Sequence, residues 1–551
     1  MIARIFVIWV CFVFVVFISS AQSKNESKKK ANPAMDWHLR AVDPDGFHGA
    51  EVWKAYEYLK QRQPKAKTIV AIIDGGVEIS HEDLKASLWV NRGEIPGNGV
   101  DDDGNGYIDD VHGWNFAGNA DGTQLINGSL EADREYLVLS GKFEGIDTSC
   151  LSRKGYKEYR YFKEEVEPFS SIWQTKQMIA EAEIAEKYAE QFEKELREKF
   201  PERKVFALKH FGTLAEENDV DTERMRAYNY FRSFWRKNPL TSWSKLYAKR
   251  KTLVKEAREI HQKQIDITVI SEKERAALGD NQRNTSDRKY GNNNLSGEIS
   301  SLHGMHVGGI VGATRNNGLG FDGVADVELM FIRLSEGNGD ERDKDVASAI
   351  RYAVDNGARV INMSFGKRTS PGKKMVVKAM RYAEKKGVLL VHAAGNDGAS
   401  LEVYHLYPSK HLTSKRDLTN WIAVGSIGMQ GHPAKSSNYG KTEVDLFAPG
   451  DGINSTVPHN KYRNLRGTSM AAPVVTVVIA LIWNYFPELS AEEVKQAVLE
   501  GVTVRKGEMV RKPGQGNENI DFGELCVTGG VVNALEAVKI AESMSVKTKN
   551  R

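Results

Sequence analysis

From about residue 300 onward, short apolar runs alternate with amphipathic runs, and this alternation constrains the fold more than any other feature of the sequence. The apolar runs are rich in β-branched residues, as strands buried on both faces of a sheet are: 327–334, 358–363 and 387–392, with an earlier one at 68–73. Residues 345–356 and 374–386 instead carry apolar side chains at helical spacing. Strand–helix–strand alternation predicts an α/β fold, a parallel sheet flanked by helices in three layers, α/β/α.

Between residues 120 and 289 the pattern changes to long charged helices with apolar stripes. The two stripes follow steps of three and four residues: Met178, Ala182, Ala185, Ala189, Phe192 and Leu196, then Leu246, Leu253, Ala257 and Ile260. Such stripes predict two helices that bury each other in a hairpin or small bundle. Two interpretations remain open for this inserted subdomain: plain structural packing, or a role in gating or docking substrate.

The N-terminus has the pattern of an export signal. Arg4 precedes an unbroken apolar run, 5–18, and small residues then surround Ala21. This pattern predicts a signal peptide cleaved after Ala21, and a mature protein in the periplasm, on the cell surface or in the medium. The alternative is an uncleaved anchor, although the run is shorter than the about 20 residues that a membrane span needs. After cleavage we expect no stable membrane span.

These features divide the 551 residues into six expected segments. They are a signal peptide (1–21), a polar lead-in (22–66), the first part of the α/β domain (67–119), the helical insertion (120–289), the second part of the α/β domain (290–541) and a tail (542–551).

Charge and cysteine content exclude some classes of function. The chain has 76 basic and 73 acidic residues, a formal net charge of +3. This balance gives no electrostatic reason to expect nucleic acid as a partner. Outside the apolar N-terminal run only Cys150 and Cys526 remain, too few for a disulfide framework. A single bridge and two buried thiols are both compatible with the sequence.

Three distant motifs bring together the residue types of nucleophilic catalysis. Asp74 ends the buried run 68–73, His303 opens a glycine-rich helical segment, and Ser469 begins an apolar helix within residues 467–473 (GTSMAAP). A serine hydroxyl is a weak nucleophile unless a histidine accepts its proton and a carboxylate orients that histidine. By contrast, we expect His306 and His392 to be structural rather than additional bases.

The order Asp, His, Ser and the flanking motifs resemble the subtilisin-like serine peptidases over about residues 67–119 and 290–540. The resemblance implies a serine endopeptidase that acts on polypeptides through an acyl-enzyme intermediate and needs no cofactor for catalysis. It assigns the triad to Asp74, His303 and Ser469 and the oxyanion-binding amide to Asn396, with the N–H of Ser469 as second donor. It also implies that Ser364, Phe365 and Gly366 pair with the substrate backbone.

The sequence departs from the family pattern at several points. Gly75 stands where the family usually has Ser or Thr, and Met305 stands where it usually has Thr. The stretch between the Asp and His motifs is also unusually long. A folded propeptide is not evident before residue 67. The alternative to an enzyme is therefore a catalytically silent scaffold of this fold, which binds a partner through its helical insertion.

Two regions are candidates for structural calcium. Residues 101–110 (DDDGNGYIDD) place oxygen ligands at alternate positions, as the first part of a calcium loop does. The candidate ligands of this loop are Asp101, Asp103, Asn105 and Asp109. A solvated acidic turn is the alternative. The resemblance to calcium-binding relatives adds Asp83 and Asn317, with carbonyls of Leu319 and Phe321.

Residues 318–323 (GLGFDG) match a dinucleotide-binding fingerprint in letters only. That fingerprint must follow a strand and open a helix, so that the helix N-terminus meets the pyrophosphate. Here the glycines follow a predicted helix and precede a predicted strand, and we reject a nucleotide cofactor.

Overall fold

A computed structural model of the chain describes residues 35–549 except 215–221, 238–240, 285, 298–300, 316, 321, 338 and 414–415. The expected signal peptide, 1–21, and Phe321 lie outside the described residues.

The centre of the protein is a mostly parallel sheet, in the order β11-β14-β9-β8-β5-β4-β1-β3-β2, with β10 paired to β9. The central strands pair in parallel, and β10 and β11 add antiparallel pairs. The strand bounds are β1 Ile69–Asp74, β2 Gly113–Asn115, β3 Glu328–Arg333, β4 Val360–Met363, β5 Leu389–Ala393, β8 Trp421–Gly428, β9 Leu446–Val457, β10 Lys461–Arg466, β11 Thr503–Val504 and β14 Gly530–Val531. Short hairpins form from β6 His411–Thr413 with β7 Arg416–Asp417, and from β12 Met509–Arg511 with β13 Asn519–Asp521.

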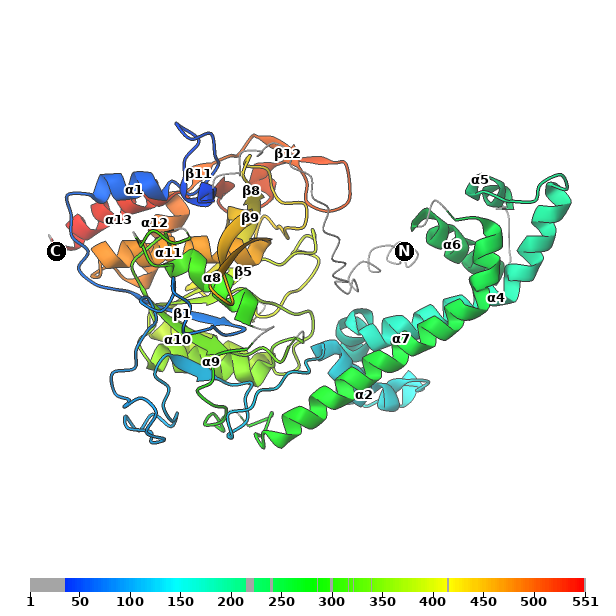
Figure 1. Ribbon diagram of the computed structural model, residues 1–551, viewed down its shortest axis with the longest axis horizontal. Helices are drawn as coiled ribbons and strands as arrows, with labels where there is room; N and C mark the ends of the chain where they lie inside the picture. Colours follow the sequence, from blue (N-terminus) through cyan, green and yellow to red (C-terminus); the bar gives the residue numbers. More distant parts are fainter. Residues whose placement is uncertain are drawn as a thin grey trace. The chain divides into compact units, whose positions relative to one another are not determined.

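Helices cover both faces of this sheet (Figure 1). α9 (Asp343–Asp355) and α10 (Lys373–Lys385) share one core with β1, β3 and β4. α8 (Ser301–Gly312) and α11 (Thr468–Tyr485) cover the other face, with α1 (Val52–Leu59), α12 (Ala491–Glu500) and α13 (Ala534–Lys549) nearby. The predicted three-layer α/β/α fold is therefore confirmed.

α11 is an apolar helix that belongs to the core. Among the described residues it is the one helix long and apolar enough to cross a membrane, and 89% of its apolar window is buried inside the protein. It packs against β4, β5, β8 and β9, the middle of the sheet. Its apolar composition is therefore satisfied by the sheet beneath it.

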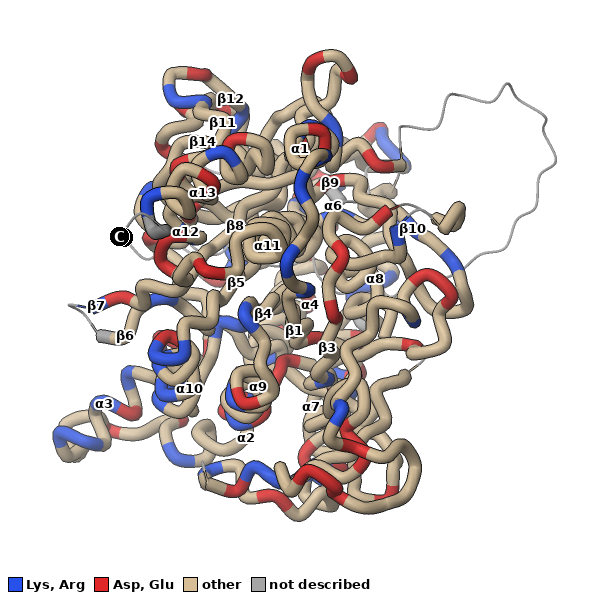
Figure 2. The backbone as a smooth tube through the Cα atoms, turned by 90° about the vertical axis from the view of Figure 1, so that its left-hand side faces the viewer, with Lys and Arg blue, Asp and Glu red and all other residues tan. Residues whose placement is uncertain are grey.

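Between β2 and α8 the chain forms the predicted helices of the insertion. They are α2 (Glu131–Phe143), α3 (Arg153–Tyr161), α4 (Ser171–Lys199), α5 (Leu208–Phe211), α6 (Thr222–Lys237) and α7 (Trp243–Ala277). α4 and α7 pack against each other, and most of their stripe residues are buried, as predicted. Met178 and Ile260 are exposed, so the stripes extend beyond the surface that the partner helix covers. Figure 2 shows acidic and basic positions interspersed along the elements of the protein.

Both remaining cysteines are free thiols. Cys150 is exposed and Cys526 is buried, so the structure has neither the bridge nor the two buried thiols with which the sequence is compatible. The reason is their placement: Cys150 follows α2 in the insertion, whereas Cys526 packs in an apolar cluster beside β14.

Candidate active site

The three residues predicted as a triad stand at the ends of elements that contact one another. Asp74 is the last residue of β1, His303 lies in the first turn of α8, and Ser469 is the second residue of α11. α8 packs against both β1 and α11. The carboxyl ends of parallel strands form the edge at which an open α/β fold presents functional side chains. The fold therefore brings three distant parts of the chain to one region.

The Asp74 carboxylate holds His303 by a bifurcated hydrogen bond. Nδ1 of the imidazole lies 2.8 Å from Oδ1 and 3.0 Å from Oδ2 of Asp74. Oδ1 also accepts a hydrogen bond from the Gly75 N–H at 2.7 Å. The Asp74 side chain is 6% exposed, whereas that of His303 is 41% exposed. A buried acceptor thus fixes a ring that remains accessible.

Two opposing effects set the pKa of His303. Desolvation lowers the pKa, because burial disfavours the charged imidazolium. The charge and hydrogen bond of Asp74 raise the pKa, and the Glu341 carboxylate adds a smaller contribution in the same direction. The net pKa lies above the ordinary value of histidine. Asp74 therefore stabilises the protonated ring, as the orienting acid of a catalytic histidine does.

The Ser469 hydroxyl points to a neighbouring carbonyl. Ser469 Oγ donates a 3.1 Å hydrogen bond to the Ser364 carbonyl oxygen. Within the described part of the chain, no hydrogen bond joins Ser469 Oγ to His303. The structure therefore brings Asp74 and His303 into contact and places Ser469 on an adjacent helix, with its hydroxyl directed elsewhere.

Asn396 follows β5 and is oriented by the start of α11. Its Oδ1 accepts a 2.9 Å hydrogen bond from the Thr468 N–H, and Thr468 Oγ1 accepts one of 3.0 Å from the Gly395 N–H. Because the carbonyl end of the amide is occupied, the amino end remains to donate, and Asn396 is exposed. Its side chain can thus offer an N–H to an anion beside Ser469.

Ser364, Phe365 and Gly366 directly follow the end of β4. The buried Ser364 Oγ accepts from Asn362 Nδ2 at 2.9 Å and donates to the Ser469 carbonyl at 2.9 Å. Phe365 is half-buried and Gly366 is exposed. The segment is thus fixed at Ser364 against the start of α11 and accessible from Phe365 onward.

The two other histidines near these motifs are buried among structural elements. His306 Nε2 lies 3.1 Å from the Ile453 carbonyl and 2.9 Å from the Arg463 carbonyl, and burial lowers its pKa to about 4. His392 packs against the Trp421 ring at 4.8 Å between centroids, and burial lowers its pKa to about 3. Both rings are neutral at physiological pH.

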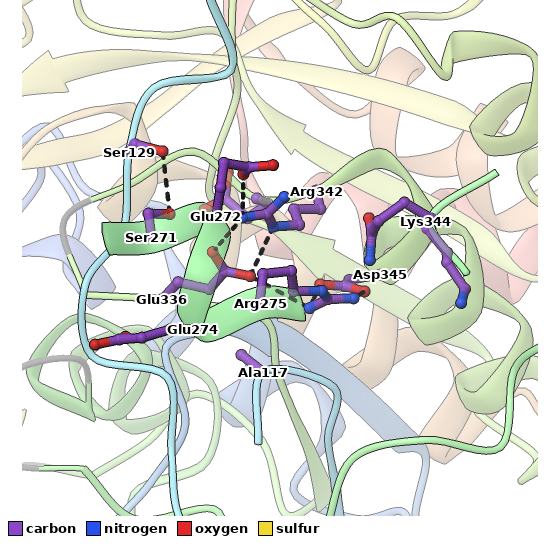
Figure 3. Close-up of polar contacts among 12 residues, drawn as sticks. Ala117, Ser129, Ser271, Glu272, Glu274, Arg275, Glu336, Arg342, Lys344 and Asp345 are labelled. Atoms are coloured by element: carbon purple, nitrogen blue, oxygen red, sulfur yellow. Dashed lines mark hydrogen bonds and ion pairs between the residues drawn. The ribbon is translucent and has the colours of Figure 1, made fainter. Parts of the chain in front are cut away.

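The end of α7 contacts the loop that follows β3 and the start of α9 (Figure 3). Arg275, near the end of α7, pairs with Asp345 at 2.7 and 2.8 Å and with Glu336 at 3.2 Å. Arg342 pairs with Glu336 at 2.8 Å and with Glu272 of α7 at 2.9 Å. Arg275, Glu336 and Asp345 are almost fully buried. Buried ion pairs therefore join α7 to the loop after β3 and to α9.

The acidic loop gathers some of the predicted calcium ligands and separates others. Carboxylate oxygens of Glu94, Asp101 and Asp103 lie within 4.8 Å of one another, an arrangement that could hold a metal ion. Asp109 instead accepts hydrogen bonds from the N–H groups of residues 97–99. Asn105 donates to Asp103 and to Asp110, at 3.1 Å each.

The second pair of candidate calcium ligands, Asp83 and Asn317, form a hydrogen bond with each other. Asn317 Nδ2 donates to Asp83 Oδ1 at 2.7 Å, and the Tyr462 hydroxyl donates to Asp83 Oδ2 at 3.1 Å. Asp83 is fully buried, and the Leu319 N–H donates to Asn317 Oδ1 at 2.9 Å. Protein donors thus satisfy both carboxylate oxygens of Asp83.

Two acidic residues at these sites carry no motif in the sequence. Glu94 stands seven positions before the acidic loop, and its carboxylate accepts from the N–H groups of Asp102, Asp103 and Asp109. Glu341 precedes α9 and acts on the pKa of His303. Neither Glu94 nor Glu341 belongs to a sequence pattern with regular spacing. The one signal in the sequence is an acidic residue near the predicted boundary of a helix or strand.

Comparison with known proteins identifies the family of this chain. The sequence model of the subtilase family matches residues 65–517, more than half of the chain. The chain is 40% identical over 181 residues to a thermophilic serine proteinase of Bacillus sp. (strain AK1), covering 33% of this chain and 42% of that protein. It is 35% identical over 206 residues to the major intracellular serine protease of Bacillus subtilis (strain 168), covering 37% and 62%.

A third relative is subtilisin DY of Bacillus licheniformis, with 36% identity over 203 residues, 36% of this chain and 70% of that protein. The chain thus spans less than half of the first relative's length and less than two thirds of the second's. With a family model that extends over most of the α/β fold, the conclusion is plain: the chain belongs to the subtilase family.

Proposed function

We propose that this protein is a serine endopeptidase that hydrolyses peptide bonds through an acyl-enzyme formed on Ser469. The observation that carries the proposal is the hydrogen-bonded pair Asp74–His303 on β1 and α8, next to the helix whose second residue is Ser469. Membership of the subtilase family supports a polypeptide as substrate.

The chemistry assigns one role to each side chain. Ser469 Oγ attacks the scissile carbonyl carbon while its proton passes to Nε2 of His303. Asp74 stabilises the resulting imidazolium, which then protonates the leaving amine. A water molecule, deprotonated by the same ring, hydrolyses the ester and frees Ser469. Asn396 and the Ser469 N–H donate to the oxygen on which negative charge develops.

The Ser469 hydroxyl must change its hydrogen bond before it can react. Its bond to the Ser364 carbonyl is broken by rotation about the Cα–Cβ bond, which redirects Oγ toward His303. Catalytic hydrogen bonds are often absent or misaligned in a free enzyme and form only with substrate in place. A substrate strand that lies along Ser364, Phe365 and Gly366 would bring the scissile carbonyl to this hydroxyl.

Cleavage of casein by matched serine variants tests this proposal. Ser469→Ala is expected to lower the cleavage rate by more than about a thousandfold, because the nucleophile is lost. Ser543→Ala, an exposed serine on α13, is the control and should retain the wild-type rate. Circular dichroism confirms that both variants fold. Undiminished cleavage by a folded Ser469→Ala protein would contradict the assignment and favour the catalytically silent scaffold.

We further propose that calcium binds between Glu94, Asp101 and Asp103. Clustered carboxylate oxygens are the ligands that this hard cation prefers, and two of the three residues stand in the loop with calcium-like spacing. Asp83 and Asn317 are a second candidate, at which an ion would have to replace their mutual hydrogen bond.

Export is the third part of the proposal. The charged start and apolar run of residues 1–21 support cleavage after Ala21 and a mature protein outside the cytoplasm. N-terminal sequencing of protein recovered from the periplasm or medium should begin at Gln22. Recovery of the chain in the membrane fraction with the apolar run attached would support the anchor instead.

We also propose that residues 67–119 and 290–541 fold as the peptidase domain and that 120–289 is an insertion. The helices from α2 to α7 all lie within the proposed insertion, while the strands of the central sheet lie outside it.

A further inference from the structure

A pocket lies beside the segment proposed to bind substrate. Part of its lining is apolar and is called the floor here: Phe365, Val346 of α9, and Val376 and Met380 of α10. The charged part of its lining is called the rim and includes Glu341, Asp343, Lys367, Lys373 and His411. Because Phe365 is shared with the proposed substrate segment, a substrate bound along that segment would place a side chain at the mouth of this pocket.

The buried Lys367 pairs with two other carboxylates and not with the Glu341 carboxylate. Its ammonium lies 2.7 Å from the Glu131 carboxylate, 3.0 Å from the Asp343 carboxylate and 2.6 Å from the Glu341 backbone carbonyl. The contacts with Glu131 and with the Glu341 carbonyl are hydrogen bonds, and the contact with Asp343 is an ion pair. Lys367 is therefore already paired, and Glu131 of α2 takes part in pairing it.

The other cations of the rim are also paired. Lys373 lies 3.3 Å from the Tyr407 hydroxyl and 3.8 Å from the Glu165 carboxylate. His411 contacts Asp417 and Glu443 through its two ring nitrogens, at 2.8 Å each. In the part of the chain that the structure describes, no cation pairs with the Glu341 carboxylate.

The Glu341 side chain is half-buried, and among the described residues no cation forms an ion pair with its carboxylate. Burial raises its pKa to about 7, the neighbouring Asp340 and Asp74 raise the pKa further, and Lys367 offsets this only in part. Charge at this site is costly unless a cation arrives to pair with it. A substrate side chain that fits this pocket has an apolar stem, which contacts the floor, and a positive end, which pairs with Glu341. Lysine and arginine have both.

We propose that Glu341 is a specificity-determining residue, and that this pocket takes a lysine or arginine side chain of the polypeptide substrate. The inference rests on the proposed peptidase function. A neutral or acidic side chain in the pocket would leave the carboxylate desolvated without a partner and would bind more weakly.

Peptide binding to the full-length Ser469→Ala protein tests the pocket without depending on catalysis. Fluorescent peptides carry one lysine, moved through successive positions, and each is compared with a norleucine peptide that keeps the stem and lacks the charge. At one position the lysine peptide should bind about tenfold more tightly. Glu341→Gln should abolish that difference, whereas Glu492→Gln, an exposed carboxylate on α12, should preserve it.

Equal affinities for lysine and norleucine at every position, or a lysine preference that survives Glu341→Gln, would overturn the inference. Cleavage of the norleucine peptides by the wild type is measured in parallel. Wild-type cleavage together with equal affinities contradicts the role of Glu341 alone, whereas failure to cleave any peptide contradicts the proposed peptidase itself.

Discussion

At His303 an accessible ring has its charge state set by a buried neighbour. The Asp74 carboxylate raises the pKa of His303 against the effect of desolvation. A general base must be neutral to accept a proton, so kcat/KM should rise with pH through an apparent pKa above about 6.5, the ordinary value for histidine. A neutral peptide is the substrate for this measurement, so that pairing of a cationic side chain with Glu341 does not add its own pH dependence.

Asp74→Asn supplies the matched variant for that profile. Loss of the carboxylate removes the stabilisation of the imidazolium, so the apparent pKa should fall, and kcat should fall by about 10⁴-fold. A pH profile whose apparent pKa is unchanged in Asp74→Asn would show that the pair seen in the structure does not govern the reacting base.

Asn396 is expected to act in the transition state and not in the binding of substrate. In the proposed mechanism its amide N–H donates to the charge that develops on the carbonyl oxygen, so Asn396→Ala should lower kcat by about 10²- to 10³-fold with little change in KM. Steady-state kinetics on one peptide separates the two constants. A rise in KM at constant kcat would place Asn396 in ground-state binding instead.

Some residues of the site could be predicted from the sequence and others could not. Asp74, His303 and Ser469 stand in motifs whose order and neighbours indicate chemistry. The direction of the Ser469 hydroxyl toward Ser364 depends on a side-chain torsion that no motif records. The contacts of Glu341 and Glu94 form only when separate parts of the chain come together in the fold. No spacing in the sequence predicts those contacts.

At the scale of elements, buried ion pairs join α7 to the start of α9 (Figure 3). Arg275→Met should destabilise the protein by about 3–5 kcal/mol, because it leaves the buried Asp345 carboxylate without its cation and leaves Glu336 paired with Arg342 alone. The control is Lys255→Met on the same helix, where the pair with Glu259 is exposed and the change should be below about 0.5 kcal/mol.

Urea denaturation of both variants measures the difference. Equal free energies of unfolding for Arg275→Met and Lys255→Met would mean that the buried pairs contribute nothing net.

The apolar stripes of α4 and α7 predicted which faces meet, because their period is that of a helix. They could not predict where the contact ends, as exposed Met178 and Ile260 show.

For the whole molecule, a metal ion is expected to contribute to stability. Calcium that binds the folded state and not the unfolded state should raise Tm. At a calcium concentration a hundredfold above Kd, the free energy of unfolding should increase by about 2.7 kcal/mol. A chelator should reverse the increase, and Glu94→Gln should diminish it, since Glu94 supplies one of the clustered carboxylates. A Tm that calcium and chelator leave unchanged would contradict a site in the acidic loop.

The parallel sheet and its covering helices could be predicted because buried strands and amphipathic helices alternate in the chain. The contact of α2 with the segment after β4 could not, since it depends on the buried pair of Glu131 and Lys367, more than two hundred positions apart. Most charged residues of a protein are exposed to solvent, and the sequence does not show which few become buried in the fold.

The most direct test of the account is covalent labelling by a fluorophosphonate, with the modified residue identified by mass spectrometry. A hydroxyl activated by an oriented imidazole reacts with this reagent, whereas ordinary serines do not. The wild type should be labelled at Ser469, and Ser469→Ala should not be labelled. A folded wild type that resists labelling, or a label that persists in Ser469→Ala, would contradict the central claim that Asp74, His303 and Ser469 act together.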